Sequence, residues 1–287
     1  MTAGGLRFRR AKPEDTAEML RITRNVWEGT DYLPHIWNDW LHDSSGYLMV
    51  GQVDGRVVGL QHIAVQDDGT AWLEGIRVAE EAQGTGLGQG LLEQGLEWAQ
   101  TMGCTFARLS TASSNPASNR LAEKGGMRPV ATFASLRAEA RAGGDPPDGV
   151  KLATPMDVDR VHAHLEQCLP GGFYTEGWTA YRLTRDRVRR LCGTKSVALV
   201  EGAGAIAGVL IATCTNPFRV IRVGAMTGDT ETVVRLAQFA LAQARTLMLP
   251  RLRATVSLHQ ERLHALGGVG FESARDFSMV LHEKHLG

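Results

Sequence analysis

Four short segments of the first half of the chain recur in the second half, in the same order and at nearly constant spacing. The members of the successive pairs lie 142, 149, 142 and 144 residues apart. The pairs are Ala11–Asp15 with Ala153–Asp157, Val57–Leu60 with Ile206–Val209, Arg120–Leu121 with Arg262–Leu263, and Gly126–Met127 with Gly270–Phe271. Because the four segments keep their order and the distance between the members of each pair hardly changes, the pattern indicates an internal duplication. We therefore expect the chain to fold as two copies of one unit.

The length and one breaker-rich segment indicate where the two copies separate. A chain of 287 residues is long for one domain and sufficient for two. The segment Ala142–Gly149 is rich in glycine, proline and aspartate, a composition that interrupts regular structure. We expect a first domain over residues 1–141 and a second over residues 150–287.

A glycine-rich stretch of the first copy predicts a binding site for pyrophosphate. The stretch Val78–Leu92 joins an apolar strand end, a short turn and the start of an amphipathic helix. Its glycines let backbone amides approach a ligand without a Cβ in the way, and they are Gly84, Gly86, Gly88 and Gly90. The positive end of the following helix attracts phosphate to the same place. The alternative interpretation is a glycine-rich surface loop without a ligand.

The spacing of these glycines excludes two common phosphate-binding motifs. A dinucleotide fingerprint would need a third glycine where Gln89 or Leu91 stands, and a P-loop would need a following lysine. Gln83, Gly86 and Gly88 instead match the pattern Q/R-x-x-G-x-G/A, and the stretch resembles the signature of the GCN5-related N-acetyltransferases, the GNAT superfamily. The resemblance implies that the loop holds acetyl-CoA. The residues expected to hold it are Ile76, Arg77, Val78, Gln83, Gly84, Gly86, Leu87, Gly88 and Gln89.

The order of expected elements agrees with this resemblance over most of residues 6–137. A helix begins near Asp15 and Thr16, and a glycine-containing turn at Asp54–Gly55 joins two strands. The further elements expected are strands at 63–65, 71–78 and 106–109, a helix at 87–102 ended by Gly103, and a helix at 119–124. The expected class is α+β with αβα layers. It comprises two tandem GNAT-like domains, each a mixed, mostly antiparallel sheet flanked by helices.

Glu74 is the expected general base for acetyl transfer. Strand alternation over residues 72–78 would put Glu74 on the same face as Trp72 and Ile76. A carboxylate between apolar residues is partly desolvated, which suits a base. The resemblance implies the same role, because many members carry a glutamate at this place on the strand. The alternative is a glutamate that faces solvent.

The segment Asn115–Met127 departs from the family pattern at the position of the usual acid. It resembles the block N-x-x-A-x-x-L-Y-E-K-x-G-F, but Ala122 stands where the tyrosine that protonates the CoA thiolate is usual. Ser118, Tyr32 or water are the substitutes left open. The resemblance assigns Asn115 to the pantetheine arm.

Aromatic and acidic residues concentrated at 30–41 point to the acceptor. Together with the later W-L-E-G-x-R-V block, they resemble the histidine N-acetyltransferase group, which implies a free amino acid or a small related amine. Asp31 would pair with an ammonium, and Tyr32 and Trp37 would form an aromatic wall. The alternative is a core helix with Trp37 and Trp40 packed inward.

The second copy is expected to be degenerate. Its segment Val223–Val234 lacks the glutamine and the spaced glycines, and it carries acidic residues where phosphates would lie. The alternative is that it binds CoA by another route.

Composition limits the remaining function classes. Lysine plus arginine equals aspartate plus glutamate at 31 each, which argues against broad binding to nucleic acid or membranes. The four cysteines lack metal or redox spacing, so we expect no metal, reduced thiols and a cytoplasmic protein. The leading interpretation is an N-acetyltransferase that uses acetyl-CoA and acts on a small amine. A non-catalytic acyl-CoA sensor, a peptide or protein N-acetyltransferase, and a homodimer formed through a sheet edge stay open.

Overall fold

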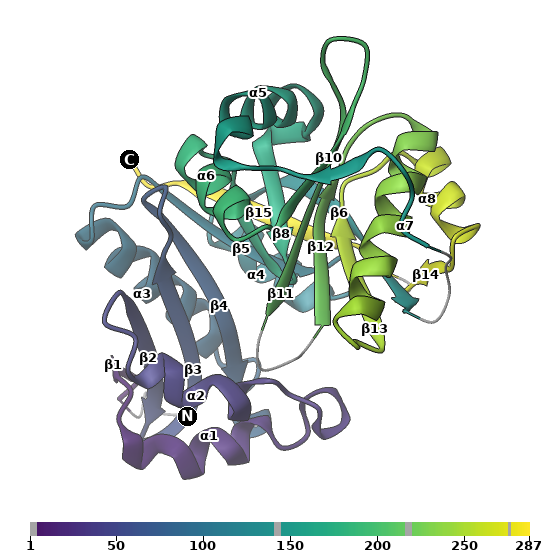
Figure 1. Ribbon diagram of the computed structural model, residues 1–287. Helices are drawn as coiled ribbons and strands as arrows, with labels where there is room; N and C mark the ends of the chain where they lie inside the picture. The colour runs from purple at the N-terminus through teal and green to yellow at the C-terminus, as the bar shows by residue number, and fades with distance from the viewer. Residues whose placement is uncertain (1–4, 141–144, 216–219, 275–276) are drawn as a thin grey trace. The chain divides into compact units, whose positions relative to one another are not determined.

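The computed structural model describes residues 5–140, 145–215, 220–274 and 277–287, and it confirms the α+β class (Figure 1). Contacts group the chain into two compact units. The first holds residues 1–109, 115–128 and 282–287, and the second holds residues 110–114 and 129–281. These ranges differ from the expected boundaries because residues 129–139 pack with the second unit and the last six residues with the first.

Five strands from the first half of the chain lie in the sheet of the first unit. They are β1 (Arg7–Arg10), β2 (Gly46–Val53), β3 (Arg56–Val65), β4 (Thr70–Val78) and β5 (Phe106–Ala112). The pairs β1–β2, β2–β3 and β3–β4 are antiparallel, and β4–β5 is parallel. The turn at Asp54–Gly55 is confirmed, with φ of 50° and 82°. The segment 63–65 is the end of the longer strand β3, and it pairs antiparallel with Ala71–Leu73 at the start of β4.

Helices cover both faces of this sheet. The helices are α1 (Thr16–Thr23), α2 (Leu33–Leu41), α3 (Leu87–Thr101) and α4 (Pro116–Lys124), with 3₁₀ turns η1 (Pro13–Asp15), η2 (Val26–Gly29) and η3 (Glu80–Ala82). Gln61 lies beneath Gly95 of α3, whereas the next residue of β3, His62, stacks on Trp40 of α2. Successive strand residues point to opposite faces, so α2 and α3 lie on opposite sides of the sheet.

The last residues of the chain complete the first unit. The final strand, β15 (Met279–His285), starts in the second unit and ends in the first. Leu286 is buried in the core of the first unit, and its carbonyl accepts a hydrogen bond from Gln100 Nε2 at 2.6 Å. Arg108, which is only 1% exposed, pairs with Asp68 at 2.8 Å and with Glu283 at 2.6 Å. The core of the first unit is therefore built from both ends of the sequence.

The second unit repeats the plan of the first. Its main strands are β6 (Arg128–Glu139), β7 (Val150–Leu152), β10 (Val197–Glu201), β11 (Ile206–Thr215), β12 (Val220–Met226), β13 (Arg251–Val256) and β14 (Phe271–Ser273). As in the first unit, antiparallel strands lead to one parallel pair, β12–β13. That pair is joined by a long helix, just as β4 and β5 are joined by α3.

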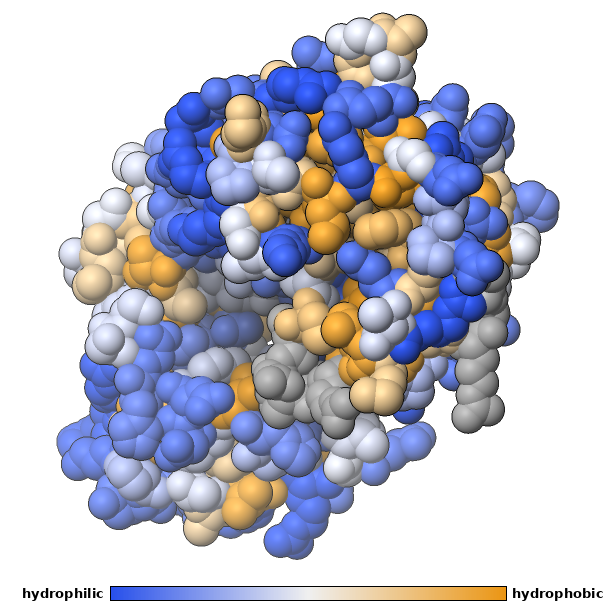
Figure 2. Space-filling view, in the orientation of Figure 1, coloured by the Kyte–Doolittle hydropathy of each residue, from blue (hydrophilic) through white to orange (hydrophobic). Residues whose placement is uncertain are grey.

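Helices also cover both faces of the second sheet. The helices are α5 (Val158–Cys168), α6 (Arg185–Gly193), α7 (Thr230–Thr246) and α8 (Gln260–Gly267), with 3₁₀ turns η4 (Pro155–Asp157) and η5 (Pro170–Gly172). One core cluster lies under α7 and another under α5 and α6. A hairpin of β8 (Phe173–Glu176) and β9 (Thr179–Arg182) packs on β12 and β13. Figure 2 shows mainly hydrophilic side chains over α5 and α6, in keeping with the exposed charged residues of these helices.

The duplicated segments adopt the same local structure. Pro13–Asp15 and Pro155–Asp157 each form a 3₁₀ turn with proline at the start and a capping box closed by the aspartate. Asp145–Gly149 contains neither helix nor strand, whereas 142–144 of the expected linker lies outside the described residues. Within the described part of the chain, no helix combines the length and apolar character needed to cross a membrane.

Candidate active site

A β-bulge in β4 sets the geometry of the candidate site. His62 pairs with Glu74, but Leu60 pairs with Arg77, so β4 holds one more residue than β3 between these pairs. Gly75 occupies the bulge with a φ of +67°, a conformation that favours glycine. The expectation that Ile76 shares a face with Glu74 is therefore wrong, because the bulge shifts the alternation and places Arg77 there instead.

The packing of Trp40 also requires a glycine at position 75. A Cβ at position 75 would lie 2.6 Å from Trp40 Cη2, closer than carbon atoms approach. The Trp40 ring also stacks on His62, with ring centroids 4.4 Å apart and planes 8° from parallel. The bulge and the tryptophan together fix Glu74 and His62 beneath α2.

The outer edge of β4 is open beyond Trp72. Its parallel pairing with β5 covers only Thr70–Trp72, opposite Phe106–Arg108. Within the described residues, no strand pairs with this edge from Leu73 to Val78. The backbone of Ile76, Arg77 and Val78 thus lies on the stretch where an added strand-like ligand can pair.

The glycine-rich loop ends at an uncapped helix. Gly84 and Gly86 have φ of +75° and +89°, and a Cβ at either position would meet nothing within 4 Å. These glycines are therefore required by the backbone and not by packing. The first helical bond of α3 runs from Gly90 N to Gly86 O at 2.9 Å, and no side chain of the described residues caps the helix. The amides at its start suit an anion.

Most of the expected loop residues would act through these amides. Leu87, Gly88 and Gln89 occupy the first turn of α3, where backbone N–H groups lack intrahelical acceptors. The Gln89 side chain donates to Glu93 at 2.9 Å. The exposed Gln83 side chain lies 3.5 Å from Val78 O, next to the loop.

Asp31 already has a cationic partner within the protein. Arg77 Nε and Nη2 donate to its two carboxylate oxygens at 2.9 and 3.1 Å, and the side chain of Asp31 is 1% exposed. Its Oδ1 also accepts from Leu33 N. The carboxylate expected to bind a substrate ammonium is thus occupied by Arg77.

Tyr32 lies in the same cluster as Glu74. The guanidinium of Arg77 is 5.6 Å from the Tyr32 ring centre and 4.7 Å from that of Trp27, whose side chain is exposed. Burial, and next the negative charge of Glu74, raise the pKa of Tyr32 to about 12. The phenol therefore keeps its proton across the neutral and mildly alkaline range.

Two other expected site residues have structural partners. Trp37 is 3% exposed and donates its ring N–H to Thr16 Oγ1 at 3.1 Å, so the core interpretation of this tryptophan fits the structure. Asn115 Oδ1 accepts from Ser118 N at 3.0 Å and caps α4. Ala122 is fully buried, so the position of the usual tyrosine is filled by core packing.

Sequence reasoning missed His62 and Asp43. His62 Nδ1 lies 3.0 Å from Glu74 Oε1, and His62 Nε2 lies 3.4 Å from Asp43 Oδ2. The only available signal was the glycine after Glu74, which marks a bulge. The strand register that brings His62 opposite Glu74 cannot be read from the spacing of the two residues.

The described part of the second unit lacks the corresponding groups. On β12, Gly224 occupies an equivalent bulge, since Ala225 pairs with Ile211 but Val223 pairs with Ala212. Ala225 pairs with Ile211 and belongs to the core under α5 and α6, the face that corresponds to the α2 side of the first sheet, and it is apolar and 1% exposed. The position of the expected base is therefore uncharged in the second unit.

The space beside this second bulge is filled by the chain itself. A Cβ at Gly224 would lie 1.8 Å from the backbone oxygen of Thr175 in β8, so the hairpin rests directly on the bulge. Thr175 Oγ1 also donates to Thr255 O of β13 at 2.7 Å. The hairpin thus spans the two parallel strands at the place that is open in the first unit.

The helix start is closed as well. Only residues 227–229 separate β12 from α7, whereas residues 79–86 separate β4 from α3. Asp229 caps α7 by accepting from Thr232 N at 2.8 Å. Hydrogen bonds from Thr232 hold the pKa of Asp229 below its usual value, so the carboxylate stays negative where an anion would bind.

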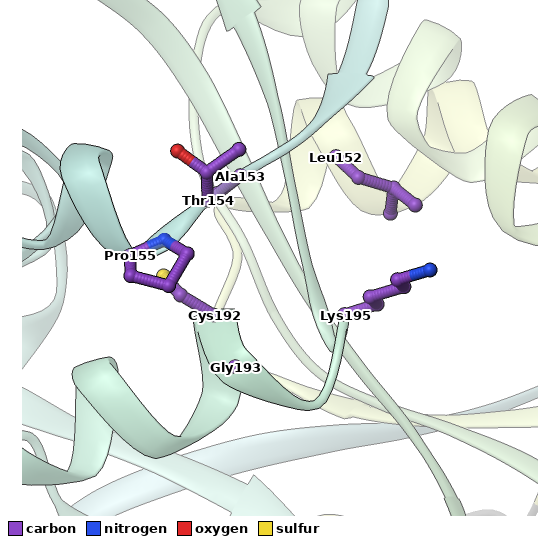
Figure 3. Close-up of a pocket in the computed structure, with 7 residues that line it drawn as sticks. All are labelled: Leu152, Ala153, Thr154, Pro155, Cys192, Gly193 and Lys195. Atoms are coloured by element: carbon purple, nitrogen blue, oxygen red, sulfur yellow. The ribbon is translucent and has the colours of Figure 1, made fainter.

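A small cavity of about 200 Å³ in the second unit lies at the end of α6 (Figure 3). It is lined by Leu152, Ala153, Thr154, Pro155, Cys192, Gly193 and Lys195. Burial, and next Asp157, raise the pKa of Cys192 to about 11, so its thiol is protonated near neutral pH. Among the described residues, no group of three histidine, cysteine, aspartate or glutamate side chains could hold a metal ion.

Comparisons with known proteins give the family of the first unit. Residues 14–127 match the family model described as Acetyltransferase (GNAT) family. The histidine N-acetyltransferase of Oreochromis niloticus is 34% identical over 93 residues, which are 32% of this chain and 28% of that protein. The human protein named "Probable N-acetyltransferase 16" is 30% identical over 239 residues, covering 72% of this chain and 62% of that protein. The matches thus span less than two thirds of these relatives.

A solved structure shows the same fold in tandem. The tandem GNAT protein from the clavulanic acid biosynthesis pathway superposes with a TM-score of 0.60 at 16% identity, and 99% of each chain is covered. Both units therefore have a GNAT-like fold. The match at residues 14–127 identifies this part of the chain as a domain of the acetyltransferase (GNAT) family.

Proposed function

We propose that this protein is an N-acetyltransferase that moves an acetyl group from acetyl-CoA to the amine of a small molecule, with free amino acids such as histidine as the leading class. The first unit carries the reaction. The observation behind this proposal is that one strand, β4, leads from the carboxylate of Glu74 along an open edge to the uncapped start of α3.

Acetyl-CoA supplies the thioester, and the first unit offers groups that suit each part of it. The amides at the start of α3 and the loop glycines fit the pyrophosphate. The open edge at Ile76, Arg77 and Val78 fits the pantetheine amides, which can pair as an added strand. Asn115 is a weaker candidate for this role because its side-chain oxygen already caps α4.

Glu74 acts as the base. As the amine nitrogen forms its bond to the acetyl carbon, the nitrogen loses one proton to a carboxylate oxygen of Glu74, and the carbon–sulfur bond breaks. The Glu74 side chain is 26% exposed, so it can exchange this proton with solvent. A positioned base contributes about 10²- to 10⁴-fold to the rate.

Tyr32 provides the proton for the departing CoA thiolate. Its phenol lies in the electrostatic range of Glu74 and keeps its proton, with a pKa of about 12. It therefore replaces the tyrosine that is absent at Ala122. A thiolate is a fair leaving group, so this acid speeds the reaction without being indispensable.

The acceptor lies against two aromatic residues that precede α2. Trp27 and Tyr32 stack with ring centroids 6.0 Å apart, and Trp27 is 55% exposed. An acceptor with a planar ring fits such a surface. This agrees with the relative that is named histidine N-acetyltransferase.

The second unit is a degenerate domain without an acetyl-CoA site. Ala225, the β8–β9 hairpin and the Asp229 cap support this part of the proposal. A cytoplasmic location is also part of it, and it agrees with the four free cysteines.

A thiol-release assay with a panel of amines tests the proposal. Purified protein is mixed with acetyl-CoA and with histidine, other amino acids, polyamines and peptides, and both free CoA and acetylated product are measured. We expect release that depends on a small amine and that matches product one to one. Tight acetyl-CoA binding without turnover on any acceptor would favour a sensor, and turnover on peptides alone would favour a peptide acetyltransferase.

A further inference from the structure

His62 is a buried imidazole between two carboxylates. Its side chain is 2% exposed, whereas the Glu74 and Asp43 side chains are 26% and 25% exposed. Glu74 Oε1 lies 3.0 Å from Nδ1 on one side of the ring, and Asp43 Oδ2 lies 3.4 Å from Nε2 on the other. The proposed acetyl transfer does not use this imidazole, so its burial beside Glu74 has no explanation in that reaction.

The neighbouring residues are arranged to hold this ring. Trp40 covers one face of it in a parallel stack. Gly46 leaves room on the Asp43 side, since a Cβ there would lie 2.3 Å from Asp43 Oδ2 and 2.8 Å from His62 Nε2. Asp43 is itself fixed by the amide and hydroxyl of Ser45, at 2.8 and 2.7 Å. The imidazole therefore has very little freedom to turn.

The hydrogen-bond donors and acceptors in these contacts indicate a function for the arrangement. A carboxylate only accepts hydrogen bonds, so at 3.0 Å the Nδ1 atom must be the donor to Glu74. That bond uses Oε1 and leaves Oε2 to take a proton from an amine. Arg10 donates to the backbone carbonyls of Asp43 and Gly46.

We propose that His62 is a positioning residue for the base: its Nδ1–H holds one oxygen of Glu74 so that the other faces the acceptor amine. This inference rests on the proposed role of Glu74. It assigns His62 no contact with substrate. A base displaced by about 1 Å loses up to about 10²-fold in rate, which sets the size of the effect.

Two isosteric substitutions separate the two ring nitrogens. In His62→Asn the amide nitrogen takes the place of Nδ1 and can still donate to Glu74, whereas in His62→Gln it takes the place of Nε2 and faces Asp43. His62→Leu offers neither donor. We expect His62→Leu and His62→Gln to lower kcat by about 10- to 100-fold, and His62→Asn to recover most of the loss. KM for acetyl-CoA is expected to stay within about twofold in all three, because His62 lies away from the loop.

A spectroscopic measurement tests the contact without relying on activity. In ¹⁵N spectra of the side chains, the His62 signal, identified by its loss in His62→Asn, should report a protonated Nδ1. The Glu74→Gln change should alter the Nδ1 signal more than the Asp43→Asn change does. An unprotonated Nδ1, or a His62 ring signal that does not change in Glu74→Gln, would overturn the inference.

The outcomes also separate this inference from the proposed function. If Glu74→Gln removes turnover but folded His62→Leu keeps it within about twofold of the wild-type rate, only the role of His62 is wrong. If Glu74→Gln itself keeps full turnover, the proposed base is wrong and the role of His62 falls with it. Thermal unfolding and calorimetric binding of acetyl-CoA confirm that each variant is folded. Equal rates for His62→Asn and His62→Gln would contradict the assignment to Nδ1.

Discussion

The partners of individual side chains decide which residues are available for chemistry. Asp31 is neutralised by Arg77, and Trp37 is enclosed in the core, so neither presents a free group to an acceptor. Glu74 and Tyr32 lie in one cluster, and the Glu74 carboxylate is partly exposed. The candidate chemistry thus rests on two of the residues expected from the sequence, supported by His62.

Tyr32→Phe should lower kcat by about tenfold while leaving KM for acetyl-CoA nearly unchanged. The loss is modest because a thiolate leaves readily without an acid. Since burial raises the pKa of Tyr32 to about 12, the phenol is protonated from about pH 6 to about pH 9. The ratio of wild-type to variant rates should therefore stay constant over that range. A ratio that falls toward one at the alkaline end would show that the phenol ionises there and contradict the assignment.

The sequence singles out Glu74 and Tyr32 as candidates but not their neighbours. Glu74 stands out because a carboxylate in an apolar strand is unusual, and Tyr32 because it belongs to an aromatic cluster. His62 and Asp43 come from other segments, and only the strand register and the bend after α2 bring them to Glu74. The bulge at Gly75 likewise breaks the simple alternation on which the expected face of Ile76 depended.

The loop and the start of α3 act together as one element, but their glycines serve different needs. Gly86 adopts a left-handed conformation that disfavours any side chain. A Cβ at Gly88 would instead make ordinary contacts, with Val78 Cγ2 at 3.7 Å and Leu121 Cδ2 at 3.9 Å. The two positions therefore differ in how well they tolerate substitution.

Gly86→Asp should abolish acetyl-CoA binding, and Gly88→Ala should keep it. The first change strains the backbone and adds a negative charge beside the phosphates. Isothermal titration calorimetry should give one acetyl-CoA per wild-type chain and per Gly88→Ala chain, and none for Gly86→Asp. Residual stoichiometric binding by Gly86→Asp would reveal a site in the second unit.

The two 3₁₀ turns with capping boxes, Pro13–Asp15 and Pro155–Asp157, allow a matched comparison of how each aspartate contributes to stability. Asp15 accepts from Lys12 N at 2.8 Å and from Arg9 at 2.7 and 2.8 Å, whereas Asp157 accepts mainly from Thr154. Asp15→Asn should cost about 2–3 kcal/mol of unfolding free energy and Asp157→Asn about 1 kcal/mol. Urea unfolding of both variants at neutral pH measures the difference.

The contribution of Asp15 should depend on pH. The hydrogen bonds from Arg9 hold its pKa below the ordinary 3.8, so the folded state favours the carboxylate. The stabilisation is complete above the ordinary value and disappears as pH falls through the folded value. The gap between wild type and Asp15→Asn should therefore shrink as the solution is acidified from about pH 6 to about pH 3. A gap that widens in acid would contradict this sign.

At the scale of the whole molecule, the last residues of the chain stabilise the first unit. Glu283 pairs with the fully buried Arg108, so Glu283→Gln should lower the stability of that unit by about 3 kcal/mol. The exposed pair of Glu272 with Arg137 provides the control, and Glu272→Gln should change stability by no more than about 0.5 kcal/mol. Amide hydrogen exchange should speed up in β3 and β4 of the first variant but not in α7. Equal effects of the two variants would contradict the account.

The duplication made the two-unit fold predictable, because each repeated segment carries its own structural signal: a capped turn, a strand glycine or a helix end. It was not predictable that the last strand, β15, would end in the first unit. Nothing in the local pattern of residues 282–287 tells which of two similar sheets they complete. The loss of function proposed for the second unit was partly readable from the missing loop, whereas the hairpin resting on Gly224 required the structure.

The central claim is that Glu74 is the general base, and the rate of acetyl transfer by the Glu74→Gln variant tests it most directly. The variant keeps the size of the side chain and removes the base, and Glu97→Gln on the exposed face of α3 is the matched control. With the best acceptor from the panel, we expect Glu74→Gln to lower kcat by about 10²- to 10⁴-fold and Glu97→Gln to match the wild type. Acetyl-CoA affinity should be equal in all three. Full turnover by folded Glu74→Gln would contradict the account.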